Sequence, residues 1–296
     1  MNGATRRGFL GLAAAAAGAV AAPTRAVARS SQRFTDVAIS TGDVIVAART
    51  IGRGEPIVMH PSLARGGRDF DPLALRLAAR GYRVISFDPR GIGQSWAPAS
   101  ALQDLDLHAY ARDMLAVVDH FELERAHVFG HAYGNRVART FATDHPRRSA
   151  TVILCACGGG IPTPEVVLGL SEVTDPETSA AEIRRVTKRV FFAPGNDPSP
   201  WYLGWYAAAG RAEQLSVVRT DFAAIEGGGD KPTLIVQGKQ DIVAPPAIGH
   251  DLRRRYGRRI TVRDLDHAGH AMIIERTDAV ARVMLDFLAR HPLGRG

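Results

Sequence analysis

Short apolar runs rich in branched side chains alternate along this chain with longer stretches in which apolar residues recur every three or four positions. The first pattern is typical of buried strands, and the second of helices that cover a sheet. The alternation predicts an α/β fold with a mostly parallel, twisted sheet of about eight strands and helices on both faces. The predicted strands are 34–40, 44–52, 56–59, 82–87, 126–129, 151–156, 232–237 and 260–265.

The alternation stops over residues 161–230, where the pattern is helical and aromatic residues gather. We predict a helical lid there, inserted into a core domain made of residues 29–160 and 231–296, because lids over a pocket commonly exclude water from the chemistry. Aromatic residues at helical spacing more often pack together than bind a ligand. Within this lid, Trp201 and Trp205 are the residues predicted to contact an apolar substrate.

Residues 1–28 have a different composition from the rest of the chain. The segment Thr5-Arg6-Arg7-Gly8-Phe9-Leu10 precedes an alanine-rich run over 12–22 and the small residues Ala26-Val27-Ala28. This order is typical of a twin-arginine (Tat) signal peptide that is removed after export. The apolar run is too short to span a bilayer of about 30 Å, so no stable membrane anchor is expected. We therefore predict a periplasmic or secreted protein that meets the Tat translocase during export.

Removing this segment lowers the formal net charge from +7 to +4, because it contains three arginines and no acidic residue. The remaining basic residues are scattered, apart from five arginines within 253–259. Tyr256 is the single aromatic residue within that cluster and no nucleic-acid motif accompanies it, so it indicates a solvated basic face and no nucleic-acid partner.

The two cysteines, Cys155 and Cys157, lie two positions apart in an apolar run. On a strand such residues point to the same side at a spacing poorly suited to a disulfide. We expect neither a disulfide nor a metal site from them.

The sequence Gly130-His131-Ala132-Tyr133-Gly134 joins a predicted strand to a predicted helix over 133–144. The pattern G-x-S-x-G in this context marks a nucleophile elbow, a strained turn that presents a serine hydroxyl to the active site. Here the central residue is alanine.

Four further features accompany the elbow in chain order. They are the turn at His60, the loop Asp88-Pro89-Arg90-Gly91-Ile92-Gly93, an aspartate after a late strand, and a histidine before the last helix. Together with the elbow, these motifs resemble the α/β-hydrolase family along nearly the whole chain after the signal segment. The resemblance implies the α/β-hydrolase fold and a catalytic site at the elbow.

The resemblance assigns the catalytic acid to Asp241 and the catalytic histidine to His270, in preference to His267. An imidazole held by a carboxylate keeps one tautomer and gains basicity, as a general base requires. A simpler interpretation of Asp241 is a turn or cap residue ahead of the following helix.

Backbone N–H groups supply the oxyanion hole of this family. The resemblance gives the first donor as Tyr133, the residue after the elbow apex, at a helix N-terminus. The family usually has His-Gly at the second donor, whereas this chain has His60-Pro61-Ser62. Because proline has no N–H, Ser62 is the expected donor, with Leu63 behind it.

Loss of the serine nucleophile typically lowers the kcat of a serine hydrolase by about a million-fold. An acyl-enzyme at Ala132 is therefore excluded. Among the neighbours, Cys157 is the least unsuitable substitute nucleophile, but a buried structural cysteine is the better interpretation.

Three hypotheses remain open. The first is an exported enzyme in which the His270–Asp241 dyad acts without covalent catalysis on a small, apolar ester- or carbonyl-type substrate. The second is a disarmed hydrolase that only binds a small molecule, and the third is a serine-to-alanine variant of an active esterase. No sequence motif indicates a metal, nucleotide or flavin cofactor.

Overall fold

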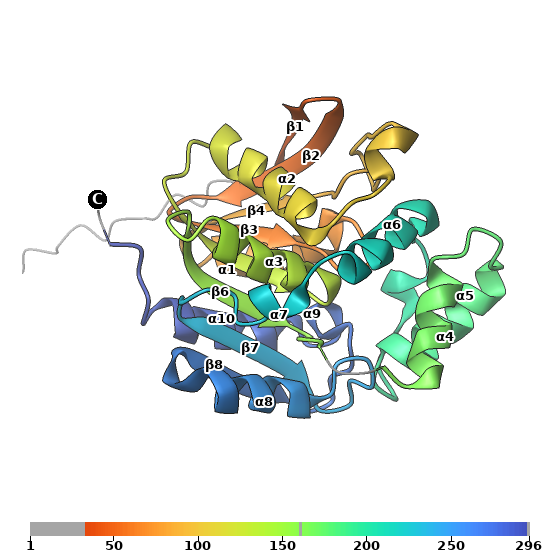
Figure 1. The fold of residues 1–296 in the computed structure, drawn as a ribbon. Coiled ribbons are helices and arrows are strands. Elements are labelled where there is room, and N and C mark those ends of the chain that lie inside the picture. Colours follow the sequence, from red (N-terminus) through yellow and green to blue (C-terminus); the bar gives the residue numbers. More distant parts are fainter. Residues whose placement is uncertain (1–32, 160–161, 295–296) are drawn as a thin grey trace, which may run out of the picture. The chain divides into compact units, whose positions relative to one another are not determined.

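Eight strands form one sheet in the part of the chain that the computed structural model describes, residues 33–159 and 162–294 (Figure 1). The predicted signal peptide lies outside these residues. The strand order is β1-β2-β4-β3-β5-β6-β7-β8. The strands are β1 (Thr35–Thr41), β2 (Val44–Gly52), β3 (Glu55–His60), β4 (Tyr82–Phe87), β5 (Ala126–His131), β6 (Ser149–Cys155), β7 (Thr233–Gly238) and β8 (Ile260–Leu265).

Strand β2 pairs antiparallel with both β1 and β4. The remaining neighbours in the sheet, β4-β3-β5-β6-β7-β8, all pair in parallel. The predicted sheet of eight, mostly parallel strands is thereby confirmed. Parallel neighbours need crossover connections, and helices supply them. The helices are α1 (Asp71–Ala78), α2 (Leu107–His120), α3 (Tyr133–Asp144), α4 (Pro164–Val173), α5 (Ala180–Val186), α6 (Ala207–Val218), α7 (Phe222–Ile225), α8 (Pro246–Tyr256), α9 (Met272–Glu275) and α10 (Thr277–Leu288).

Alternate residues of each central strand feed two separate apolar cores. In β3, Ile57 and Met59 pack with Leu77 of α1 and Phe287 of α10, whereas Val58 packs on the other face, in the core that contains α2, α3 and α8. Successive side chains of a strand point to opposite faces, so a strand covered on both sides reads as a continuous apolar run. This explains why the central strands are apolar without alternation.

Helices α4 to α7 fall between β6 and β7 in the chain, where the regular alternation stops. Figure 1 shows α4, α5 and α6 beyond the carboxyl ends of the strands, the end of the sheet at which the loops after β5, β7 and β8 also lie. In such folds ligands bind outside the carboxyl ends of parallel strands. No helix within 33–159 or 162–294 combines the length and apolar character that crossing a membrane requires.

Candidate active site

The turn after β5 is a strained elbow with a methyl group at its apex. Ala132 has φ 52° and ψ −111°, and α3 begins at the next residue. Its N–H donates to the carbonyl of Cys155 at 2.9 Å, and its own carbonyl accepts from Asn135 at 3.1 Å. A residue with a side chain in such a conformation costs about 1–3 kcal/mol, so the surrounding structure must enforce it. The chain keeps the elbow geometry without a hydroxyl.

Gly134 shows how closely the elbow crosses the neighbouring turn. A Cβ atom at this position would lie 2.3 Å from the carbonyl oxygen of His60 and 2.4 Å from that of Pro61. Only glycine permits this approach, because those contacts are with backbone atoms. The second glycine of the motif therefore sets the elbow against the turn after β3.

His270 and Asp241 form a buried pair. Asp241 follows β7 and His270 precedes α9, and His270 Nδ1 lies 3.0 Å and 3.1 Å from the two carboxylate oxygens. Asp241 Oδ1 also accepts the N–H groups of Val243 and Ala244, each at 2.8 Å. The carboxylate fixes the proton on Nδ1 and leaves Nε2 as the basic nitrogen. The structure thus brings together the two residues assigned from sequence.

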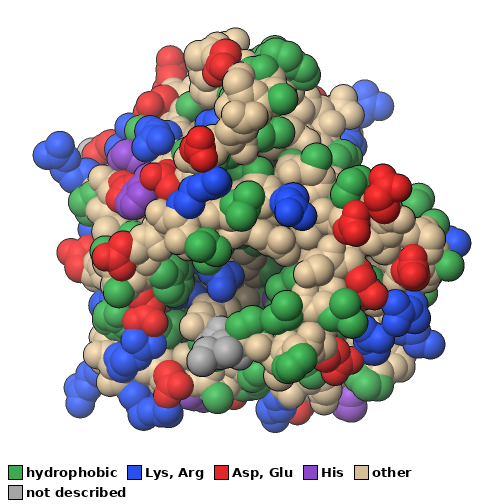
Figure 2. Space-filling model, turned by 45° about the vertical axis from the view of Figure 1, so that its right-hand side comes forward, with side chains coloured by type: hydrophobic (Ala, Val, Ile, Leu, Met, Phe, Trp, Pro, Cys, Tyr) green, Lys and Arg blue, Asp and Glu red, His purple; other side chains and the backbone are tan. Residues whose placement is uncertain are grey.

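A cavity of about 200 Å³ contains both the elbow apex and the histidine. Figure 2 shows a hollow rimmed largely by hydrophobic side chains, with basic side-chain atoms on its wall. The residues that line the cavity come from the loops after the strands and from α3, α4 and α6: Ser62, Leu63, Ala132, Tyr133, Arg136, Ala156, Gly158, Gly159, Pro162, Val166, Leu170, Phe191, Trp205, Gln214, Val217, Val243, Ala244 and His270.

The residues expected to form the oxyanion hole also line this cavity. Tyr133 is the first residue of α3, so its N–H has no acceptor within the helix. After β3, Ser62 and Leu63 face the cavity, whereas the N–H of Ala64 donates to Glu213 Oε2 at 2.7 Å. The donors left for an oxyanion at this turn are therefore Ser62 and Leu63.

His131 has a positioning role that the sequence did not reveal. Its Nε2–H donates to the backbone carbonyl of His270 at 2.8 Å, and its ring lies 5.7 Å from the His270 ring. Complete burial, together with the nearby His270, lowers the pKa of His131 to about 3, so the ring is neutral. His131 occupies the second position of the elbow motif, which is open to any residue. A histidine at that position is the one sequence feature that could have pointed to this contact.

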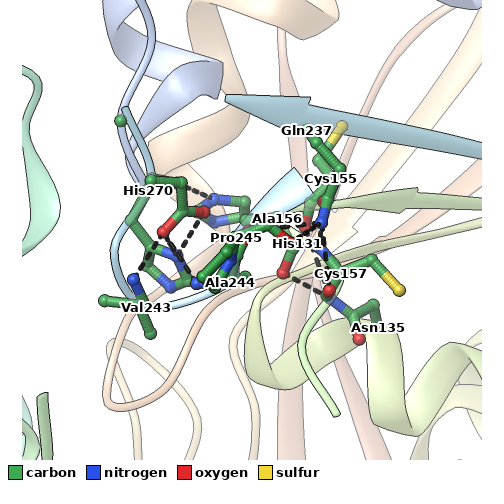
Figure 3. A network of polar contacts seen from close by, with 12 residues as sticks. His131, Asn135, Cys155, Ala156, Cys157, Gln237, Val243, Ala244, Pro245 and His270 are labelled. Atoms are coloured by element: carbon green, nitrogen blue, oxygen red, sulfur yellow. Dashed lines mark hydrogen bonds and ion pairs between the residues drawn. The ribbon is translucent and has the colours of Figure 1, made fainter. Parts of the chain in front are cut away.

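Two buried amides bind backbone groups at the end of β6, and one of them also binds the loop that carries Asp241. Gln237, the next-to-last residue of β7, accepts the N–H of Cys157 at 2.6 Å and donates to the carbonyl of Ala244 at 3.2 Å. From α3, Asn135 donates to the carbonyl of Ala156 at 2.9 Å. Figure 3 shows this network beside the His270 pair. Neither amide is predictable from the sequence, because a single Gln or Asn carries no recognisable pattern.

The expectation for Trp201 needs correction. Trp205 lines the cavity, but Trp201 is fully buried and packs edge-on against His131, with ring centroids 5.8 Å apart. The two residues do not share a helix face, because the short helix of Ser199–Trp201 ends before Trp205. The Trp205 ring nitrogen donates to the Trp201 carbonyl at 2.7 Å. Trp201 packs behind His131 and Trp205 and does not line the cavity.

The expectation that both cysteines point the same way is also wrong. Ala156 between them has φ 54°, so Cys155 packs in one core and Cys157 in the other. Both are free and buried, and burial raises the pKa of each thiol. Cys157 Sγ accepts from Arg139 at 2.8 Å and does not line the cavity. A thiolate nucleophile at this position therefore has no support.

Within residues 33–159 and 162–294, no group of three or more His, Cys, Asp or Glu side chains has the arrangement of a metal site.

A family model described as "alpha/beta hydrolase fold" matches residues 55–173. A non-heme haloperoxidase from Rhodococcus erythropolis is 28% identical over 259 residues, which cover 80% of this chain and 93% of that protein. The 2-hydroxy-6-oxononadienedioate/2-hydroxy-6-oxononatrienedioate hydrolase of Paraburkholderia xenovorans is 26% identical, with 88% of this chain and 96% of that protein covered.

Among solved structures, an esterase from Exiguobacterium antarcticum superposes with a TM-score of 0.75 at 19% identity, covering 86% of this chain and all of the other. The chain therefore has the α/β-hydrolase fold, and the proteins it is similar to include hydrolases, esterases and haloperoxidases.

Proposed function

We propose that this protein belongs to the α/β-hydrolase family and is an enzyme that acts on a small, apolar ester- or carbonyl-type substrate by non-covalent general-base catalysis. One observation carries the proposal: the hydrogen-bonded His270–Asp241 pair lies on the same cavity as the elbow apex and its backbone donors. A molecule that only bound a ligand would have no use for a buried acid–base pair. The family assignment rests on the fold, the order of the motifs and the similarity to hydrolases.

With an ester, His270 takes a proton from a water molecule, and the resulting hydroxide attacks the carbonyl carbon. The negative charge that develops on the carbonyl oxygen is stabilised by the N–H of Tyr133 and by a donor at Ser62. Collapse of the tetrahedral intermediate breaks the bond to the alkoxide, which takes the proton back from His270. The alanine methyl at the apex leaves room for the water.

With a substrate that carries an acidic C–H next to a carbonyl, the same base removes that proton. The enolate oxygen then occupies the position of the oxyanion. Both reactions need a base and an oxyanion site, and neither needs the missing hydroxyl.

The helices of residues 161–230 are the proposed lid, and the apolar side chains that they contribute to the cavity favour an apolar substrate. Leu170 of α4, Val217 of α6 and Trp205 between α5 and α6 form apolar parts of the cavity wall. Such walls exclude water, and exclusion of water strengthens electrostatic stabilisation of the developing charge. The lid and Trp205 thereby belong to the proposed binding site.

The test compares wild type, Ala132→Ser, His270→Ala and the double variant on p-nitrophenyl esters with short and long acyl chains. We expect slow turnover by wild type, reduced at least about a hundredfold in His270→Ala, because general-base catalysis is worth about 10²–10⁴. Mass spectrometry after acid quenching should find an acyl adduct only in Ala132→Ser. Formation of that adduct would show that a serine hydroxyl at the apex can reach the carbonyl carbon of a bound ester.

Wild-type turnover that survives in His270→Ala would remove the dyad from the mechanism. A wild type without turnover, beside a strongly active Ala132→Ser, would instead identify a disarmed hydrolase or a serine-to-alanine variant. Arg211→Gln on the exposed surface of α6 serves as the matched control and should behave as wild type.

A further inference from the structure

The proposed mechanism leaves one cavity residue unexplained. Of the described residues that line the cavity, Arg136 is the only one with an Arg, Lys, Asp or Glu side chain, and most of the others are apolar. It lies in the first turns of α3, four residues after Ala132. Residues four apart in a helix are separated by about 6 Å along its axis. Arg136 and Ala132 therefore lie close together on the same wall of the cavity.

No carboxylate of the described residues pairs with Arg136. Its Nε is buried without a hydrogen-bond partner there, and its guanidinium carbon lies 5.6 Å from the ring of Phe222. The undescribed segments, 1–32, 160–161 and 295–296, contain no Asp or Glu. Burial, with the neighbouring Arg139, lowers the pKa of Arg136 to about 10, so the side chain is charged at neutral pH.

Two other arginines that are buried or half-buried, Arg65 and Arg90, are paired with carboxylates. Arg65 forms an ion pair with Asp69 at 2.8 Å, and Arg90 forms one with Asp113 at 2.7 Å. An unpaired charge in an apolar wall is costly, and a structure that keeps one commonly gains its counter-ion from a ligand. Arg136 differs from Arg65 and Arg90 in having no carboxylate partner among the described residues.

Arg139, three residues further along α3, adds to the positive potential. Its Nη2 donates to Asn135 Oδ1 at 3.1 Å and to the carbonyl of Gly158 at 2.8 Å, both of which are neutral acceptors. The nearby Glu226 carboxylate is bound by Arg255. Two positive side chains therefore lie one turn apart on α3, and one of them, Arg136, faces the apolar cavity.

We propose that Arg136 binds a carboxylate of the substrate, so that the cavity selects small acids, such as the half-esters of diacids or keto acids, over neutral molecules of the same shape. The guanidinium offers two parallel N–H donors that match a carboxylate. The catalytic consequence rests on the proposed function, whereas the binding of the carboxylate does not.

The test uses phenylacetate and its neutral counterpart phenylacetamide as probes, with affinities measured by isothermal titration calorimetry. We expect wild type to bind phenylacetate about ten- to a hundredfold more tightly than the amide, the range given by a hydrogen bond to a charged group. Arg136→Gln should abolish this preference. Arg136→Lys should keep part of it, because a lysine retains the charge and loses the paired donors. Arg211→Gln removes an exposed charge of α6 and should leave the preference unchanged.

Equal affinities for the two probes in wild type, or an undiminished preference in Arg136→Gln, would overturn the proposal. If Arg136→Gln does not fold, the wild-type preference and its weakening in Arg136→Lys still decide the question. His270→Ala separates the two proposals, because it should lose turnover and keep the binding of phenylacetate. A carboxylate preference without any ester turnover would refute the proposed function alone, and turnover without the preference would refute only the role of Arg136.

Discussion

Ala132 occupies a backbone conformation that a residue with a side chain rarely adopts, although it has no functional group to present. The hydrogen bond from its N–H to Cys155 and the close crossing at Gly134 hold the turn in place. Backbone strain of this kind concentrates at functional sites. The same turn places Tyr133 on the cavity wall, where its N–H is the proposed first oxyanion donor even though the nucleophile is missing.

At the same scale, His131 connects the elbow to His270, the proposed general base. We predict that His131→Phe, which keeps a planar ring and removes the donor, lowers the free energy of unfolding by about 1–3 kcal/mol at pH 7.5. The carbonyl of His270 would lose its partner, so kcat should fall more than KM changes. Denaturant unfolding and steady-state kinetics measure the two effects.

The difference in stability between wild type and His131→Phe should decrease as the pH falls. The pKa of His131 is about 3 in the folded protein and about 6.5 in the unfolded chain, so its contribution to stability is complete above pH 6.5 and is lost as the pH falls towards 3. Wild type should lose about 2–3 kcal/mol from this group between pH 7.5 and 4.5, and His131→Phe should not. The two stabilities should approach each other in acid. A constant difference across this range would show that His131 is not buried as a neutral ring.

At the scale of elements, one carboxyl joins α6 to the turn after β3. Glu213 is fully buried, its Oε2 accepts the N–H of Ala64 at 2.7 Å, and its Oε1 has no partner in the described residues. Gly210, one turn earlier, allows the contact, because a Cβ there would lie 2.5 Å from the Cβ of Ala64. Helix α6, which lines part of the cavity, is thereby attached directly to the turn that carries Ser62, the proposed second oxyanion donor.

Burial raises the pKa of Glu213 to about 8, so the group is largely protonated at neutral pH. Its folded pKa exceeds its unfolded value of about 4.5, so its contribution is complete below pH 4.5 and is lost as the pH rises through 8. We predict that Glu213→Gln gains about 3–4 kcal/mol of stability relative to wild type between pH 5 and 8.5, because the amide keeps the acceptor and cannot ionise.

Chemical denaturation at several pH values measures this gain. Glu165, an exposed acid at the start of α4, provides the control as Glu165→Gln and should show no such trend. A Glu213→Gln variant that follows wild type up to pH 8.5 would place the carboxyl in contact with solvent.

At the scale of the whole molecule, the proposed export concerns residues 1–28, which lie outside the described part. We predict that the full-length chain, expressed in a bacterium with a functional Tat pathway, is recovered outside the cytoplasm with an N-terminus just after Ala28. Substitution of Arg6 and Arg7 by lysine should retain the precursor inside the cell, because the twin arginines are the recognised signal. Cell fractionation and N-terminal sequencing give the result, and equal export of both forms would contradict it.

The sequence by itself determined the strands, the sheet class and the position of the elbow. These features follow from local rules: strands buried on both faces are continuously apolar, and a tight strand–helix turn needs glycine at fixed offsets. The order of the motifs, through the resemblance to the α/β-hydrolase family, also singled out Asp241 and His270. No comparable rule separates Trp201 from Trp205, or assigns a partner to a lone Gln237.

Only the tertiary structure decided which distant groups meet. His131 and the carbonyl of His270 are 139 residues apart, and Glu213 and Ala64 are 149 apart. Such contacts depend on how the helices pack over the ends of the strands. That packing also decides whether a side chain faces the cavity or the core. The absence of a carboxylate partner for Arg136 among the described residues was likewise visible only in the structure, because it depends on where the fold places all the acidic residues.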